Sequence, residues 1–432
     1  MPYLLLLTFI SIYTTGWLAE VMGVIPRQLT WFPDMASLLV LGYLLIQFRR
    51  QKSWDFLYLL LLLLGLSLIP LLRGETSLII YLSGLRNYFK FLPFFFLPQV
   101  LPIQEYRQFR LYFIYVVIII TLIQIPVAVW QRFITFEGAQ TGDVIGGTLG
   151  ANASGYLSQF MFFTISFFVA LYFTRKISLP KLALFSLILL LPTLLNETKV
   201  TLILLVMLGT MLILVRTGIR WEKKVAIAGV ALFSIILFNN VYAILYAGRE
   251  LPQHLVLEYI RDPETAIYGR WFTKSGTLNR IPQVLFAMAS IAADPYHLLW
   301  GVGLGNASHS PFAGAIGDYY RRFVEFDIDS SYLGRHIWEW GILGLGGWAI
   351  MFGKLFRYSL KHRQNLFSIW FLGVFSVFIV GFVYNINILN DVLGYYFWVL
   401  AGITIREDKI ETRLAQFAAR LATYRTSNRT PG

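Results

Sequence analysis

The stretch Asp329-Ser330-Ser331-Tyr332-Leu333 stands where a long polar segment gives way to an apolar one. The polar segment runs from about residue 248 to residue 335 and holds a glycine-rich sequence, Gly-Val-Gly-Leu-Gly, at residues 301–305. Connections longer than about 15 residues are usually functional or disordered. This one contains large residues of a type that is normally buried, so we expect it to be folded and to hold the functional site. Those residues are Trp271, Phe286, Trp300 and Phe312.

The composition outside this segment is that of a membrane protein. Hydrophobic residues make up 57% of the chain and charged residues 14%, against about 45–50% and 25% in soluble domains. Apolar runs recur from the first residues to about residue 405, which predicts one all-α polytopic helix bundle (1–405) that includes the loop at about 248–335. A basic cytoplasmic tail (406–432) follows it. Residues 2–20 lack the basic start of a signal peptide, so we interpret them as a retained first span.

The apolar runs can be counted as membrane spans, because about 20 residues cross the hydrocarbon core. They predict about twelve transmembrane helices, with a range of 10–12. The two arms at 181–195 and 199–215 are short, and whether this hairpin fully crosses stays open. The predicted spans are about 3–20, 31–48, 54–72, 77–98, 110–131, 155–174, 181–195, 199–215, 225–246, 336–356, 366–386 and 391–405.

The basic residues indicate the orientation of the bundle, since Lys and Arg near span ends remain on the cytoplasmic side. With a cytoplasmic N-terminus, both termini are cytoplasmic and the loop at about 248–335 is extracytoplasmic. The inner connections, within 49–52, 107–110, 175–181, 216–224 and 354–363, then carry most of the Lys and Arg. The short outer ones hold only Arg27, Arg73, Arg132 and Lys199.

The net charge of +13 does not indicate nucleic-acid binding, because the basic residues are scattered and form no stripe or RNA-binding motif. The absence of cysteine excludes a disulfide framework and thiol chemistry. In the tail, apolar residues from Ile410 to Leu421 recur at helical spacing beside Arg413 and Arg420. This pattern suits either an amphipathic helix on anionic membrane lipids or a solvated tail.

Charged residues inside predicted spans are expensive and mark candidate sites. Arg86 and Lys90 lie four residues apart on one helix face, so they cannot neutralise each other and call for an anion. The alternatives are a structural partner for Arg86 and snorkelling of Lys90. Lys199 either faces a substrate phosphate or pairs locally with Glu197.

The end of the polar loop is the most informative part. Ser330 or Ser331 can cap the next helix, which would place Asp329 at the positive end of its dipole, ionised and able to accept a proton. Arg335 and Glu339 are spaced for an ion pair four residues apart, and Arg270 and Arg280 precede an amphipathic run, Ile281 to Ala292, that could lie at the membrane surface. The glycine-rich sequence follows no strand, so it is not a dinucleotide fingerprint; it brings backbone close to a ligand or to another helix.

In these features the sequence resembles the superfamily of bacterial O-antigen polymerases and O-antigen ligases. The shared features are a glycine-rich Gly-Val-Gly-x-Gly in a large external loop and an arginine before it, which Arg280 matches better than Arg270. Asp329 to Leu333 and the Glu339 to Gly344 run resemble the family's His-Asn-x-Tyr-Leu and Glu-x-Gly-x-x-Gly. Residues 147–152 resemble its Gly-Thr-Phe-Gly-Asn-Pro-Asn turn, and Thr198-Lys199 stands where members often carry Ser-Arg.

The resemblance implies a GT-C-like membrane glycosyltransferase of the bacterial cytoplasmic (inner) membrane. A polyprenyl-diphosphate-linked glycan would be the donor, and no cofactor or metal is expected, although Asp327-Ile328-Asp329 fits the Asp-x-Asp pattern that can hold a divalent ion. Asp329 and Arg280 are the predicted catalytic residues, and a chain-length regulator or flippase is a candidate partner. The predicted binding residues for diphosphate or glycan are Arg86, Lys199, Arg270, Arg335 and Tyr332.

Two departures leave alternatives open. The family often has histidine where this chain has Asp329, which favours a polymerase over a ligase; His309 and His336 are candidates for a displaced base. A lipid-linked glycan transporter or flippase is the rival from another class. It would explain twelve spans and Arg86 without chemistry, but we find no inverted repeats in the sequence.

Overall fold

The computed structural model describes residues 1–50, 53–137, 142–150, 153–196, 198, 200–215, 225, 278, 280–310, 312–384, 390–407 and 410. Within these residues the regular elements are all helices and there is no strand, which confirms the all-α prediction. The predicted span at 225–246, the loop residues 248–277 and nearly all of the tail lie outside the described residues.

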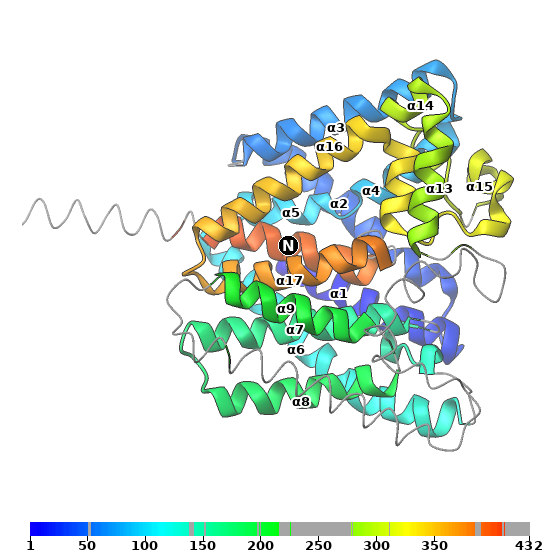
Figure 1. Cartoon of the computed structure of the whole chain (residues 1–432). Helices are drawn as coiled ribbons and strands as arrows, with labels where there is room; N and C mark the ends of the chain where they lie inside the picture. The colour runs from blue at the N-terminus through cyan, green and yellow to red at the C-terminus, as the bar shows by residue number, and fades with distance from the viewer. Residues whose placement is uncertain are drawn as a thin grey trace, which may run out of the picture.

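The first part of the chain forms long helices that run side by side along the bundle (Figure 1). A π-helical turn, Trp17–Val21, extends α1, and a 3-10 turn, Arg27–Trp31, leads into α2. The helices are α1 (Pro2–Gly16), α2 (Phe32–Ile46), α3 (Trp54–Arg73), α4 (Leu78–Phe89), α5 (Leu92–Val100), α6 (Ile103–Trp130), α7 (Ser154–Phe173), α8 (Leu179–Leu195) and α9 (Val200–Val215).

The second part contains short helices and then long ones. The bundle helices are α16 (Tyr332–Lys361), α17 (Leu366–Tyr384) and a last helix over residues 391–407. Between α9 and α16 lie the short helices α13 (Arg280–Ala292), α14 (Pro295–Trp300) and α15 (Asp318–Arg322). The last helix extends at least two residues beyond the predicted bundle boundary, because Arg406 donates to the carbonyls of Gln99 and Leu101 and Arg110 contacts Glu407.

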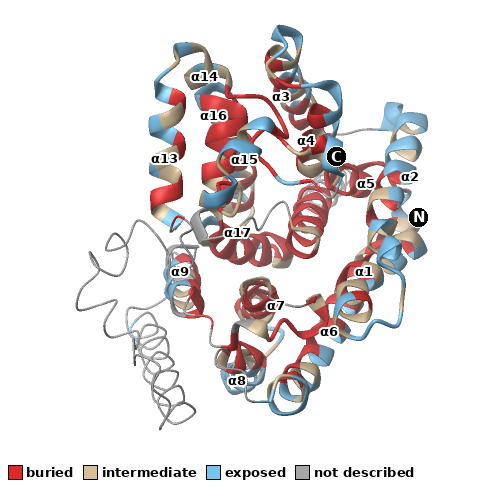
Figure 2. Ribbon diagram, turned by 90° about the vertical axis from the view of Figure 1, so that its right-hand side faces the viewer, coloured by how far each residue is buried: buried red, intermediate tan, exposed pale blue. Residues whose placement is uncertain are grey.

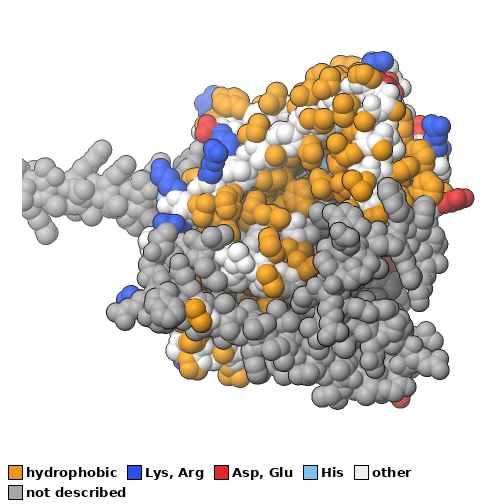
Figure 3. Space-filling model, in the orientation of Figure 1, with side chains coloured by type: hydrophobic (Ala, Val, Ile, Leu, Met, Phe, Trp, Pro, Cys, Tyr) orange, Lys and Arg blue, Asp and Glu red, His pale blue; other side chains and the backbone are white. Residues whose placement is uncertain are grey.

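The described residues have the surface expected of a membrane protein. Five helical stretches, each at least 18 residues long, are apolar enough to cross a bilayer, and α8 is a shorter apolar helix. Leucines that would be buried in a soluble protein are exposed on outer helix faces, as at Leu38, Leu61, Leu122 and Leu187. Hydrophobic side chains cover the middle of the surface while charged ones lie towards its ends (Figure 3). Such continuous exposed apolar surface indicates contact with lipid.

The buried centre of the bundle is formed by α7 and α17, which lie side by side and are almost entirely buried (Figure 2). The Trp370 indole N–H donates to the Phe163 carbonyl over 3.0 Å. Gly373 allows the close approach, since a Cβ there would lie 2.7 Å from the Ser166 side chain. Both helices have apolar residues on all faces, because protein surrounds most of each helix.

Two predicted spans have different bounds in the structure. The span predicted at 77–98 is two helices, α4 and α5, with a break at Lys90 and Phe91. Pro93 explains the break, because its ring nitrogen cannot donate to a carbonyl of the preceding turn. The span predicted from residue 110 begins at Ile103, so Arg107 and Arg110 lie in the first turns of α6 and not in a connection.

The described residues of the predicted loop form short helices with an apolar cluster of their own. Helix α13 runs across the ends of the bundle helices, roughly perpendicular to them, in both views (Figures 1 and 2). Its buried residues Ala287 and Ile291 pack with Val302, Ile328 and Trp338 in a separate apolar cluster. Of the four large residues expected inside, Phe286 packs there, but Phe312 is exposed, because it projects from the segment before α15.

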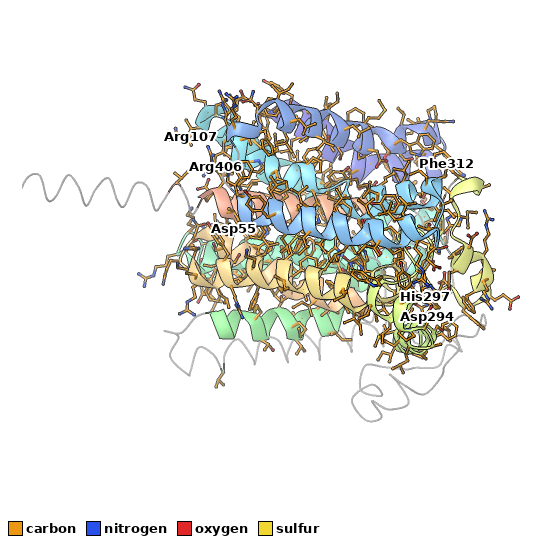
Figure 4. The ribbon with its side chains drawn as sticks, turned by 90° about the horizontal axis from the view of Figure 1, so that it is seen from above. Asp55, Arg107, Asp294, His297, Phe312 and Arg406 are labelled. Atoms are coloured by element: carbon orange, nitrogen blue, oxygen red, sulfur yellow. The ribbon has the colours of Figure 1, made fainter. Side chains whose placement is uncertain are left out.

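The bundle has two distinct ends. Asp294, His297 and Phe312 lie at one, which we call the loop end, and Asp55, Arg107 and Arg406 lie at the other, the basic end (Figure 4).

Candidate functional site

The junction between α13 and α16 brings several predicted site residues together at the loop end. The Ser330 hydroxyl accepts hydrogen bonds from the Arg280 guanidinium and from the Gln283 amide, the latter over 2.6 Å. The next residue, Ser331, caps α16 by accepting from the Gly334 N–H, as predicted. The cap turns the chain so that Asp329, just before the cap, and Arg335, in the first turns of α16, lie close to each other.

Asp329 is held in a defined place by the backbone. Its Oδ2 accepts the His309 N–H over 2.9 Å. Burial raises the pKa of the Asp329 carboxyl above its ordinary value, while the Arg335 charge and the His309 hydrogen bond act in the opposite direction. Desolvation is the largest contribution to this shift. That the helix dipole keeps the carboxylate ionised stays a prediction.

Asp327 belongs to the same acidic group. Burial and then the Asp329 charge raise the pKa of Asp327, and the Ser330 hydrogen bond and Arg280 lower it. The Asp329 charge therefore adds to burial in favouring the protonated form of Asp327. No group of three His, Asp or Glu side chains that could hold a metal occurs in the described part of the chain.

A buried ion pair continues the site along α16. Arg335 Nε lies 3.4 Å from Glu339 Oε1, and the two side chains are 5% and 0% exposed. The guanidinium also lies 5.6 Å from the centre of the Tyr88 ring on α4. The predicted pair is thus confirmed, and its burial ties α16 to α4.

Tyr332 and His336 face the same interior. The Tyr332 hydroxyl lies 3.1 Å from His336 Nε2, and the rings of Tyr88, Trp340 and Trp348 surround the imidazole. His336 is fully buried, whereas the His309 ring is exposed and lies beside Tyr320. Of the two candidates for a displaced base, His336 is therefore enclosed in the bundle and His309 lies at the surface. The backbone N–H of His309 donates to Asp329.

The glycine-rich sequence serves helix packing. Gly301, Gly303 and Gly305 all have positive φ. A Cβ on Gly305 would lie 2.2 Å from the Ile80 carbonyl oxygen of α4, and one on Gly301 would lie 2.5 Å from the Glu339 carbonyl carbon. The sequence left open whether these glycines approach a ligand or another helix. In the structure Gly305 approaches helix α4 and Gly301 approaches helix α16.

A kink in α16 receives this loop. Gly341 has φ +58° and interrupts the helix. The Trp338 carbonyl accepts instead from the Val302 N–H over 2.8 Å. The Glu-x-Gly-x-x-Gly run thus marks a broken helix, and the glycine-rich loop donates the hydrogen bond that the Trp338 carbonyl lacks within the helix. Arg335 and Glu339 lie in the part of α16 that precedes the kink.

Arg86 and Lys90 have protein anions as partners. Arg86 Nη2 contacts Asp34 Oδ2 over 2.5 Å, and Lys90 contacts Asp391 and, at 3.9 Å, Asp34. Asp34 lies in the first turn of α2 and Asp391 begins the last helix. The sequence interpretation missed both acids. Each starts an apolar run and is therefore a candidate, but the sequence does not say which cation it meets.

The start of α7 closes the site on another side. Tyr156 lies within electrostatic range of Arg280 and Asp329; the sequence reasoning did not single it out. The Asn196 amide donates to Ser154 and Ser158 on the same helix over 2.9 and 3.1 Å. Asn196 thereby anchors the turn between α8 and α9. Lys199 and Arg270 lie outside the described residues.

The turn before α7 is held by two glutamines of α6. Gln131 exchanges hydrogen bonds with both the N–H and the carbonyl of Gly147, each over 2.8 Å. Gln124 binds Thr148 in the same way, accepting its N–H and donating to its hydroxyl. The stretch that resembles the family's glycine turn is therefore a buried structural connection that places the first turn of α7.

The fold and the site define an all-helical membrane protein with a cluster of acidic, basic and aromatic side chains at one end of its bundle. No protein-family model matches the chain, and no curated protein matches it.

Proposed function

We propose that this chain is a multi-pass glycosyltransferase of the bacterial cytoplasmic membrane. It polymerises polyprenyl-diphosphate-linked oligosaccharide repeat units into a surface polysaccharide on the outer face. The observation that carries the proposal is the position of Asp329. Its carboxylate is fixed by the His309 N–H and lies within electrostatic range of Arg335, while Arg280 binds the neighbouring Ser330.

The proposed reaction is a displacement at the anomeric carbon of the donor glycan. A hydroxyl oxygen of the acceptor sugar forms the new glycosidic bond as the bond from the anomeric carbon to the diphosphate oxygen breaks. Asp329 takes the hydroxyl proton as general base, and the polyprenyl diphosphate leaves with its electron pair. A general base with a raised pKa suits this role, because a stronger base removes the proton more readily.

The leaving diphosphate needs cations that are free to meet it. Arg280 is exposed, donates to the uncharged Ser330 hydroxyl and has Asp327 within electrostatic range, so we assign it to the diphosphate. Arg335 already faces two carboxylates, Glu339 and Asp329. We therefore assign Arg335 and Tyr332 to the acceptor side of the site. Arg86, Arg270 and Lys199 remain proposed contacts to the diphosphate or glycan.

The proposed topology has about twelve spans, both termini in the cytoplasm and the loop end outside. Support comes from the separation of the two ends: Arg107 and Arg406 lie at one and the α13–α15 region at the other (Figure 4). Helix α13 supports the arrangement further, since it lies across the bundle with Leu285 and Met288 exposed, as an interfacial helix would.

The test is complementation of a deletion strain, read as a gel of surface polysaccharide and as extracted lipid-linked glycan. Asp329→Asn and Arg280→Ala should stop elongation and accumulate single repeat units on undecaprenyl diphosphate. Asp318→Asn and Arg322→Ala, which change exposed charges of α15, are the matched controls and should support a normal ladder. Normal polymer with either site variant would contradict the proposal. Loss of all lipid A-attached glycan would indicate a ligase, and single units trapped on the inner leaflet would indicate a flippase.

A further inference from the structure

Two aromatic rings from distant parts of the chain meet at the surface of the loop end. Trp31 ends the 3-10 turn before α2, and Phe312 follows the glycine-rich loop. Their ring centroids lie 5.4 Å apart with the planes tilted by 52°, and the residues are 45% and 53% exposed. Both rings therefore touch each other and still present much of their surface outward. Figure 4 places Phe312 at the loop end of the molecule.

A partly exposed ion pair begins one helical turn after Trp31. Asp34, one turn after Trp31, contacts Arg86, and the two side chains are 18% and 37% exposed. Charges that face hydrocarbon are expensive. The exposed side of Arg86 must therefore face water or a polar ligand. We call the set of Trp31, Asp34, Arg86 and Phe312 the aromatic rim.

The aromatic rim is connected to the proposed base by a short series of contacts. Ser83, one turn before Arg86 on α4, donates to the Ser310 hydroxyl over 3.3 Å. Ser310 follows His309, whose N–H binds Asp329, and it precedes Phe312 by two residues. His309 therefore binds the proposed base, and Phe312, three residues further along the chain, belongs to the aromatic rim.

We propose that the aromatic rim is a glycan subsite that binds pyranose rings of the acceptor chain, a proposal that rests on the proposed function. Pyranose rings present C–H groups on their faces and hydroxyls on their edges. Exposed aromatic rings bury the former, and ionised side chains make the strongest hydrogen bonds with the latter. The aromatic rim offers both kinds of group, with Trp31 and Asp34 one helical turn apart. The reacting acceptor hydroxyl would lie one or more sugars further on, at Asp329.

The rival occupant is the lipid interface, where tryptophan is enriched. Met35 and Leu38 continue from Trp31 along the exposed face of α2, as an interfacial anchor would require. The glycan is favoured because the partly exposed Asp34–Arg86 ion pair begins one helical turn after Trp31, and because Phe312 stands in a segment with polar neighbours. Arg321, for example, donates to the Ala313 carbonyl over 2.8 Å.

The experiment measures binding of free glycan to the purified full-length protein in lipid nanodiscs. The probe is the repeat-unit oligosaccharide released by mild acid from the lipid-linked pool of the same strain, so no lipid or diphosphate is present. Trp31→Ala combined with Phe312→Ala should weaken binding by about tenfold or more, the equivalent of about 1.4 kcal/mol. Trp31→Tyr keeps an aromatic ring and should retain most of the oligosaccharide binding. The matched control is Phe48→Ala, since Phe48 pairs with Trp54 away from the rim and should have no effect.

Binding that is unchanged after removal of both rings would overturn the subsite, and so would a wild-type protein that polymerises but does not bind the oligosaccharide. If the double variant binds the oligosaccharide normally but loses thermal stability in nanodiscs and not in detergent, the rings are a lipid anchor. A wild-type protein that binds through the rings but transfers nothing would reject the proposed function and leave the subsite standing. Size-exclusion profiles of all variants show whether each one is folded.

Discussion

Arg335 and Glu339 form an ion pair that is almost fully buried, with 3.4 Å between Nε and Oε1. The pair lies between the proposed base, Asp329, and the ring of Tyr88. Buried pairs seldom increase stability over apolar residues, because desolvation offsets the attraction. A pair kept at this position, one turn from the loop that holds Asp329, therefore indicates a role in the site more than in the fold.

Stability measurements can test this. Glu339→Gln leaves the Arg335 charge buried with a weaker partner and should lower the free energy of unfolding by about 3–5 kcal/mol. Replacing both residues, as in Arg335→Met with Glu339→Leu, should recover most of that loss while abolishing activity. Thermal unfolding of the purified variants in detergent gives the comparison. A double variant as unstable as the single one would mean that the pair supports the fold itself.

The pH dependence of transfer should follow Asp329. The base must be ionised to accept a proton, and burial raises its pKa, so activity should fall on the acid side at a pH above the ordinary aspartate value of about 3.9. The Glu339 charge also raises the pKa of Asp329, whereas Arg335 and His309 lower it. Glu339→Gln should therefore move the acid-side fall in activity to lower pH. Glu339→Asp, which keeps the charge, should leave that fall at the same pH.

Initial rates from pH 4 to 8, at a temperature where all variants are folded, provide the measurement. Lower activity of Glu339→Gln without displacement of the acid limb would show that Glu339 acts only through structure.

The helical class and the loop-end cap could be predicted from sequence because both depend on local patterns. Apolar runs have the length of the bilayer core, and Ser331 stands next to the first residue of α16, where a cap belongs. The i,i+4 pair of Arg335 and Glu339 was predicted for the same reason. Each of these inferences needs only residues within one or two helical turns.

The partners of Arg86 and Lys90 could not be assigned in this way. Their shared helix face was evident, but Asp34 and Asp391 come from the start of α2 and of the last helix. Which acid meets which cation depends on how distant helices pack. The role of residues 301–305 was open for a similar reason: glycine permits a positive φ and a close approach, but the sequence does not show that Gly305 contacts Ile80.

Alanine substitutions in the glycine-rich loop test its packing role. Gly305→Ala would place a methyl group 2.2 Å from the Ile80 carbonyl oxygen, and Gly341→Ala would place one 2.5 Å from the Gly301 nitrogen, both at positive φ. Strain and overpacking together should lower the free energy of unfolding by about 2–5 kcal/mol. Gly346→Ala, also in α16 but with open space around the site, should raise it by up to about 1 kcal/mol. Thermal midpoints that do not separate these variants would reject the packing account.

The sidedness of the bundle can be tested directly, because the chain contains no cysteine. Single cysteines can replace Arg321, whose side chain is 54% exposed in α15, and the exposed Lys361 at the far end of α16. After the kink at Gly341, α16 continues for 20 residues from Ile342 to Lys361, so this part is about 30 Å long and can cross the hydrocarbon core of about 30 Å. A maleimide that cannot cross membranes should label Arg321→Cys in intact cells and Lys361→Cys only after lysis.

The labelling result bears on the chemistry as well as on orientation. A lipid-linked glycan that is joined outside the cytoplasm can meet Asp329 only if the loop end faces outward. Labelling of Lys361→Cys alone in intact cells would place Asp329, Arg280 and the aromatic rim in the cytoplasm, and the proposed reaction would then lose its substrate. Labelling of both positions in intact cells would mean that α16 does not cross the membrane. In that case the length and kink of α16 would need an explanation other than a span that carries Arg335 and Glu339 at its outer end.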